Sequence, residues 1–259
     1  MQLENLVAVV SGIGPGLGRA IAAALAREGA QLVVAGRTPS RLEQTAEELR
    51  GAGARVLCVP TDISDPSACR ALAETTKKEF GRADVLVNNA YHPGTYEPFE
   101  QTDLATWRPP LEVNVLGTMQ VTQAFVPLLK ESGGGSIVMV NSMVIRKPLA
   151  TFGGYAASKA ALMAATQTLA IELGRYGIRV NSVVPGYIWG PQLKEFFAAE
   201  AKRSGSSVEA LYDATARETA LNHLPTPEEI AEAVVFFASD RSRAITGQSL
   251  DVNGGHCFW

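Results

Sequence analysis

Short apolar runs alternate with longer amphipathic segments along the whole chain. Residues 6–10 (LVAVV) are apolar at every position, which is typical of a strand buried on both faces of a parallel sheet. Comparable runs predict further strands at residues 31–35, 55–60, 84–87, 136–141, 178–184 and 248–252. Because strands and helices alternate throughout, we expect an α/β fold, a doubly wound parallel sheet of about seven strands with helices on both faces.

Helical periodicity fills most of the intervals between these strands. We expect helices at residues 19–28, 39–50, 65–80, 111–131, 152–176 and 226–239. The last of these opens on Thr226-Pro227-Glu228-Glu229, which has the spacing of a capping box. Residues 187–225 break the pattern and predict an irregular insertion that acts as a substrate lid. No linker or change of composition divides the chain, so we expect one domain over residues 1–259.

A glycine-rich turn follows the first strand directly and leads into a helix. In Ser11-Gly12-Ile13-Gly14-Pro15-Gly16-Leu17-Gly18, one glycine permits the tight turn, another lets the backbone approach a pyrophosphate, and Gly18 lets helix and strand pack closely. The first N–H groups of the helix then face the phosphates. Strand, glycine turn and helix together predict a dinucleotide site.

The end of the second strand bears on which dinucleotide is bound. NAD-binding folds commonly place an acidic residue here, for the ribose 2′-hydroxyl. This chain has Gly36 and then Arg37, whose guanidinium can bind a 2′-phosphate by two hydrogen bonds. NADP(H) is therefore favoured over NAD(H), although Arg37 could instead be a solvated residue or stack on the adenine.

Tyr155 and Lys159 are four residues apart within a predicted helix, which places both side chains on one face. A nearby ammonium favours the phenolate, so we expect Lys159 to lower the pKa of the phenol. The pair is a candidate general acid and base.

Composition excludes several classes of function. The formal net charge of −3 leaves no basic excess for nucleic acid, and no apolar run approaches the length of a membrane span. The first residues lack the features of a signal peptide, so we expect a cytoplasmic protein. Three cysteines and three histidines lack the spacing of metal ligands, and no metal is expected.

Over about residues 5–255 the chain resembles the short-chain dehydrogenase/reductase family. The glycine turn at residues 11–18, an Asn-Asn-Ala segment at residues 88–90 and a Pro-Gly pair after the sixth strand appear in the order of the family's motifs. By this resemblance the catalytic residues are Asn114, Ser142, Tyr155 and Lys159. The cofactor-binding residues are Gly12, Gly14, Gly16, Leu17, Gly18, Arg37, Asp62, Ile63, Asn89, Ala90, Tyr155, Lys159, Pro185, Gly186 and Ile188.

The resemblance also implies roles for the catalytic groups. Tyr155 would exchange a proton with the substrate oxygen, and Lys159 would lower the pKa of the phenol and hold the ribose. Ser142 would hydrogen-bond the substrate oxygen, and Asn114 would hold a water that leads from Lys159 to solvent. The family further suggests a homotetramer, or a homodimer, with the alanine-rich helix and the C-terminal residues at the interfaces.

Several positions depart from the family pattern. Tyr91 replaces the glycine of the Asn-Asn-Ala-Gly motif, and Pro15 stands where some NADP-preferring members carry a basic residue. Gly190 replaces a threonine that contacts the nicotinamide amide in many members, so the backbone of Ile188 is an alternative partner. Asn253 replaces the aspartate of the usual Val-Asp-Gly-Gly ending.

The expected function is an oxidoreductase that transfers a hydride between NADP(H) and a secondary alcohol or ketone. The candidate pocket residues are mostly large and apolar, which favours an alicyclic or aromatic-bearing substrate: Tyr91, His92, Val144, Phe152, Tyr187, Trp189 and Phe196. The alternative for the lid aromatics is that they pack under the lid. Alternative functions are a nucleotide-binding regulatory protein without turnover and an epimerase or dehydratase of the same fold.

Overall fold

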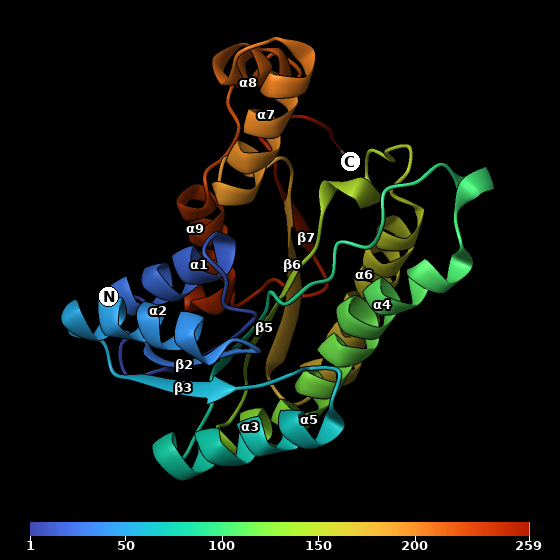
Figure 1. Ribbon diagram of the computed structural model, residues 1–259. Helices are drawn as coiled ribbons and strands as arrows, with labels where there is room; N and C mark the ends of the chain where they lie inside the picture. The colour runs from blue at the N-terminus through green and yellow to red at the C-terminus, as the bar shows by residue number, and fades with distance from the viewer. Residues whose placement is uncertain (259) are drawn as a thin grey trace.

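A seven-stranded sheet, parallel throughout, forms the centre of the computed structural model, which describes residues 1–258 (Figure 1). The strands lie in the order β3-β2-β1-β4-β5-β6-β7. Their bounds are β1 Val7–Ser11, β2 Gln31–Gly36, β3 Val56–Pro60, β4 Val85–Asn88, β5 Gly135–Val140, β6 Ile178–Pro185 and β7 Ser249–Val252. The predicted doubly wound α/β fold is confirmed.

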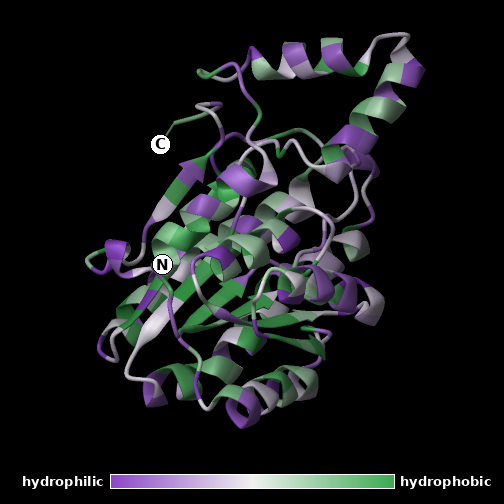
Figure 2. Ribbon diagram, turned by 90° about the vertical axis from the view of Figure 1, so that its left-hand side faces the viewer, coloured by the Kyte–Doolittle hydropathy of each residue, from purple (hydrophilic) through white to green (hydrophobic). Residues whose placement is uncertain are grey.

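Helices cover both faces of this sheet, as the alternation of side chains on the strands requires. On one face, Ala8 and Val10 of β1 pack in a core with α1 (Leu17–Arg27), α2 (Pro39–Gly51) and α9 (Pro227–Ala238). On the other, Val7 and Val9 share a core with α3 (Pro66–Phe80), α5 (Thr118–Glu131) and α6 (Gly153–Gly174). Figure 2 shows hydrophobic residues concentrated in the central strands, between helices in which hydrophobic and hydrophilic residues alternate.

The strand order reverses between β1 and β4, because β2 and β3 lie on one side of β1 and the later strands on the other. In open parallel sheets such a switch point, at the carboxyl ends of the strands, is where ligands bind. Ser11 pairs with Asn88 at this point, and Asn88 pairs with Met139. The candidate site residues therefore gather at one edge of the sheet.

Two segments differ from the expected elements. The helix expected at residues 111–131 is interrupted: α4 (Arg108–Leu111) passes through a π-helical segment, Glu112–Gly117, before α5 begins. The expected irregular insertion at residues 187–225 contains two helices, α7 (Pro191–Ser204) and α8 (Val208–Ala216), which project at the top of Figure 1. The predicted capping box at Thr226 and Glu229 is confirmed.

Candidate active site

The glycine turn is held closed by contacts that leave no room for side chains. Gly12 has a φ of +96°, and a Cβ there would overlap the backbone nitrogen of Ala90. A Cβ at Gly18 would overlap the Gly12 carbonyl oxygen. Asn89 donates a hydrogen bond from Nδ2 to that same oxygen, at 2.6 Å. Asn89, expected to bind the cofactor, therefore positions the turn itself.

The residues of the turn fit a bound pyrophosphate. Around the position that a Cβ of Gly14 would occupy, no other atom lies within 4 Å, so this glycine borders open space. Gly16 is the N-cap of α1, and no side chain caps the helix there. The N–H groups of the first helical turn, including that of Leu17, are therefore available to an anion, and the helix dipole favours negative charge.

Arg37 and Asp62 lie at the ends of the neighbouring strands β2 and β3. Arg37 is exposed, and its charge contributes to lowering the pKa of the Asp62 carboxyl. The larger causes of that lowered pKa are hydrogen bonds from the hydroxyl and the backbone N–H of Ser64. Asp62 is thus an ionised acceptor beside a guanidinium. Ile63, next to Asp62, is buried, and Gly117 lies against it so closely that a Cβ at that glycine would meet its side chain at 2.9 Å.

Ser142, Tyr155 and Lys159 meet at the carboxyl end of β5. Ser142 follows the strand and lies close enough to the Tyr155 phenol to lower its pKa. Lys159 lies one turn further along α6, with its Nζ 5.8 Å from the centroid of the Tyr155 ring. The Lys159 ammonium donates a hydrogen bond to the Val140 carbonyl oxygen at 2.8 Å, and the side chain is buried.

Burial shifts the pKa of both groups of the pair. It raises the pKa of the Tyr155 phenol above its ordinary value, and the opposing effect of Ser142 offsets only part of that rise. It lowers the pKa of Lys159 to about 7. The expected net lowering of the phenol's pKa is therefore wrong for the protein by itself, because desolvation raises that pKa and Lys159 is not among the groups that lower it.

The Asn114 side chain is fully engaged by neighbouring protein groups. Its Oδ1 accepts from the His92 backbone N–H at 2.6 Å, and its Nδ2 donates to the His92 carbonyl at 3.0 Å and to Ser158 Oγ at 2.8 Å. Ser158 in turn donates to the Tyr155 carbonyl oxygen at 2.7 Å. Asn114 thus fixes the segment after β4 against the first turn of α6, the turn that carries Tyr155.

Sequence reasoning missed Ser158 and Trp107 as supports of this turn. A Cβ at Gly154 would lie 2.9 Å from the Trp107 ring, and one at Gly153 would lie 2.5 Å from it. The indole therefore packs directly against the helix backbone before Tyr155. The glycine pair in the sequence was a signal of this close approach, although it did not identify the partner.

The predicted pocket residues separate into two groups. Phe152 and Tyr91 each lie with ring centroids 6.5 Å from Tyr155, edge to face. Val144 is buried just after Ser142, and Tyr187 follows β6. Trp189 instead packs within the segment at residues 187–225, against Tyr212 at 4.7 Å, and Phe196 is 61% exposed. For Trp189 the structure favours packing inside this segment.

The Pro-Gly pair at the end of β6 lies beside Met143, the residue that follows Ser142. Pro185 ends β6 and pairs in register with Val252. A Cβ at Gly186 would lie 2.8 Å from Asn253 and 3.3 Å from the Met143 sulfur. The Ile188 carbonyl accepts a hydrogen bond from the Gly190 backbone N–H at 2.7 Å, which fixes the chain just before α7.

Together, a phosphate cradle at a strand switch point and an adjacent tyrosine–serine–lysine group define a dinucleotide-dependent oxidoreductase. The family model described as "Enoyl-(Acyl carrier protein) reductase" matches residues 12–256. The chain belongs to the short-chain dehydrogenase/reductase family, as the sequence motifs indicated. It is an NAD(P)-dependent oxidoreductase.

Relatives and solved structures match almost the full length of the chain. Cis-4-hydroxycyclohexanecarboxylate dehydrogenase from Sinomonas cyclohexanicum is 34% identical, covering 96% of each chain. L-sorbose reductase from Gluconobacter frateurii, solved with NADPH and L-sorbose, is 33% identical with a TM-score of 0.94, covering 99% of this chain and 98% of that one. NAD+-bound xylitol dehydrogenase is 27% identical with a TM-score of 0.91, covering 98% of this chain and 100% of that one.

The described residues lack two features that would point to other partners. Across residues 1–258, no helix is long and apolar enough to cross a membrane. Within the same part of the chain, no three histidine, cysteine or acidic side chains gather as metal ligands would.

Proposed function

We propose that this protein interconverts a secondary alcohol and a ketone, with NADP(H) as the preferred cofactor and an alicyclic or aromatic-bearing substrate. The observation that carries the proposal is the meeting of Ser142 and the Tyr155 phenol beside the buried Lys159 at the carboxyl end of β5. A nicotinamide bound in this cleft would supply or accept the hydride. The protein's own groups then have to move one proton and stabilise charge on one oxygen.

Tyr155 is the group that moves this proton. Its phenol stays protonated at neutral pH because burial raises its pKa, so it holds the proton that a developing alkoxide needs. Ser142 donates to or accepts from the same oxygen and orients it. Lys159 is held by the Val140 carbonyl near the Tyr155 ring, and in its charged form it favours release of the proton.

Two finer parts of the proposal have separate support. Arg37 at the end of β2 supports the preference for NADP(H), since a guanidinium suits a 2′-phosphate. The name of the alicyclic hydroxy acid dehydrogenase among the relatives, and the Tyr91 and Phe152 rings around Tyr155, support an alicyclic or aromatic substrate. We further propose that residues 187–225 act as a lid on a single catalytic domain.

Replacing Tyr155 by phenylalanine tests the proposed function. Tyr155→Phe removes the transferable proton and keeps the ring, so kcat for ketone reduction should fall by about 10²-fold or more. The dissociation constant for NADPH, measured by fluorescence titration, should stay unchanged. Tyr176→Phe, at the far end of α6 and stacked on Lys130, is the matched control and should retain activity. Normal turnover by Tyr155→Phe would show that another group transfers the proton.

A further inference from the structure

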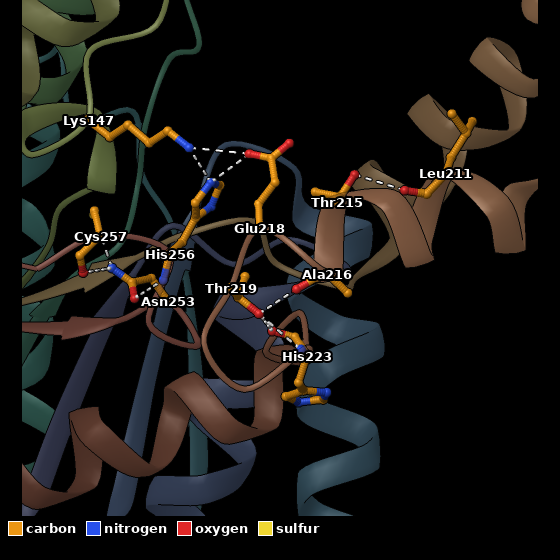
Figure 3. Close-up of polar contacts among 10 residues, drawn as sticks. All are labelled: Lys147, Leu211, Thr215, Ala216, Glu218, Thr219, His223, Asn253, His256 and Cys257. Carbon is orange, nitrogen blue, oxygen red and sulfur yellow. Dashed lines mark hydrogen bonds and ion pairs between the residues drawn. The ribbon is translucent and has the colours of Figure 1, made fainter.

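Three titratable side chains from distant parts of the chain, Lys147, Glu218 and His256, meet in one cluster (Figure 3). Lys147 Nζ lies 2.6 Å from His256 Nε2 and 3.3 Å from Glu218 Oε2. The same carboxylate oxygen of Glu218 lies 3.1 Å from His256 Nε2. Lys147 comes from the loop after β5, Glu218 from the end of the lid and His256 from the segment after β7.

The position of this cluster follows from the close packing behind it. Gly186 touches both Met143, the residue after Ser142, and Asn253, which begins the segment that carries His256. The Tyr187 ring lies against His256, with centroids 5.6 Å apart and planes inclined by 30°. Since β5, β6 and β7 are parallel neighbours, the cluster occupies the same edge of the sheet as Ser142.

The Glu218 carboxylate occupies the cluster, but the three side chains differ widely in their exposure to solvent. The His256 side chain is 2% exposed, whereas the Glu218 side chain is 57% exposed. The Lys147 side chain, 40% exposed, hydrogen-bonds to the Glu218 carboxyl and is the main cause of its lowered pKa. An exposed ion pair of this kind contributes only about 0–1 kcal/mol, so another carboxylate can displace Glu218 at little cost.

The hydrogen bonding of His256 is incomplete in the present arrangement. Its Nε2 faces both a donor, Lys147, and an acceptor, Glu218, and one neutral tautomer cannot satisfy both. Its Nδ1 is buried and has no hydrogen-bond partner among residues 1–258. A buried histidine with an unused nitrogen is a costly feature for purely structural packing.

We propose that Lys147 and His256 form a subsite for a carboxylate group of the substrate, which Glu218 of the lid fills until the substrate displaces it. This inference rests on the proposed function and narrows its substrate class to alicyclic or aromatic hydroxy acids and the matching oxo acids. The carboxylate lies on the Lys147 side of the pocket, and the reacting carbon lies at Tyr155.

Two substitutions should act in opposite directions on an acidic substrate. Lys147→Met removes the charged partner of the substrate carboxylate from a partly exposed pair, so KM for an oxo acid should rise by about twofold to fivefold with kcat nearly unchanged. Glu218→Gln removes the competing carboxylate, so KM for the same oxo acid should fall by about twofold to fivefold. Lys78→Met, an exposed lysine on α3, is the matched control and should change neither value.

The experiment uses 3-oxocyclohexanecarboxylate and 4-oxocyclohexanecarboxylate, each compared with its neutral methyl ester. Neither Lys147→Met nor Glu218→Gln should alter KM for the esters. Equal losses for acid and ester in Lys147→Met would show that the cluster only anchors the lid, and the subsite would be rejected. The subsite would also be rejected if every variant reduced the acids and the esters equally well, a result that leaves the proposed function intact.

Calorimetry separates the subsite from catalysis. In the presence of NADP+, wild-type protein should bind the oxo acids more tightly than Lys147→Met does, and more weakly than Glu218→Gln does. If no ketone or alcohol is turned over, the proposed function fails, but this binding comparison still decides on the subsite. Identical affinities for all three proteins would overturn it.

Discussion

At the scale of single residues, burial without a nearby anion controls the state of Lys159. The ammonium is 3% exposed and donates to a neutral carbonyl oxygen, so desolvation lowers its pKa to about 7. An unfolded chain would hold the same proton up to a pKa near 10.5. Between these two values the unfolded state binds more protons than the folded state, and stability therefore rises with pH.

This difference predicts a pH-dependent effect of Lys159→Met. Below pH 7 the buried charge costs the folded protein its full penalty, and the penalty is relieved as pH rises towards 10. The free energy of unfolding of the wild type, relative to Lys159→Met, should rise by on the order of 1 kcal/mol per pH unit between pH 7 and 9. Urea unfolding of both proteins measures this, and a flat difference would contradict the shift.

Arg37 is the residue on which the cofactor preference depends. Arg37→Asp places a carboxylate where a 2′-phosphate would sit, so affinity for NADPH should fall by about 100-fold or more, from the lost charged hydrogen bonds and the added repulsion. Affinity for NADH should change little or improve. Fluorescence titration with both nucleotides measures the ratio. Equal affinity of the wild type for the two nucleotides would remove the preference.

At the scale of elements, buried parallel strands were the most predictable part of the chain. The run at residues 6–10 predicted β1 within one residue, because a strand buried on both faces carries apolar side chains at every position. The capping box at Thr226 also followed from sequence, since it depends on residues three apart. Such features depend on residues close together in the sequence, so they can be predicted without knowledge of the rest of the fold.

Elements whose form depends on distant contacts could not be predicted in the same way. The π-helical segment Glu112–Gly117 surrounds Asn114, whose amide bonds to the backbone of His92, far away in sequence. The lid helices α7 and α8 share a small core of their own, including Phe197 and Leu224. The sequence did not reveal that core, because its aromatic residues do not follow a clear helical period.

In the candidate site, too, local motifs could be predicted from the sequence and long-range contacts could not. The Tyr155 and Lys159 pair and the glycine turn could be recognised because each lies in one local motif. Asn89 stays a predicted cofactor residue, but the hydrogen bond from its amide to Gly12, in the turn after β1, could not be predicted because the two residues are far apart in sequence. The sign of the pKa shift at Tyr155 was missed because burial is a property of the folded chain.

At the scale of the whole molecule, one face of α6 remains uncovered within a single chain. Ala157, Ala160, Ala164 and Thr168 are exposed along it, and Ile171 is 84% exposed. Small side chains allow a helix of another subunit to approach closely, and we expect this face to be an interface of the proposed homotetramer.

A charge on this face should break the assembly. Ala164→Arg places a guanidinium in the expected interface, so the particle should dissociate to dimers or monomers in light scattering. Ala52→Arg, an equally exposed alanine after α2, is the control and should leave the mass unchanged. If the wild-type protein is monomeric at the concentrations used, the predicted interface is wrong.

The central place of β1 in the sheet has a consequence for synthesis on the ribosome. Its first partner, β2, follows soon after it in the chain, but its second, β4, emerges only after α2, β3 and α3. Until then one edge of a strand with four consecutive apolar residues, Val7 to Val10, stays unpaired, which is the situation in which nascent chains aggregate. The protein's need for chaperones should therefore be greatest early in translation, well before the residues that transfer protons have been made.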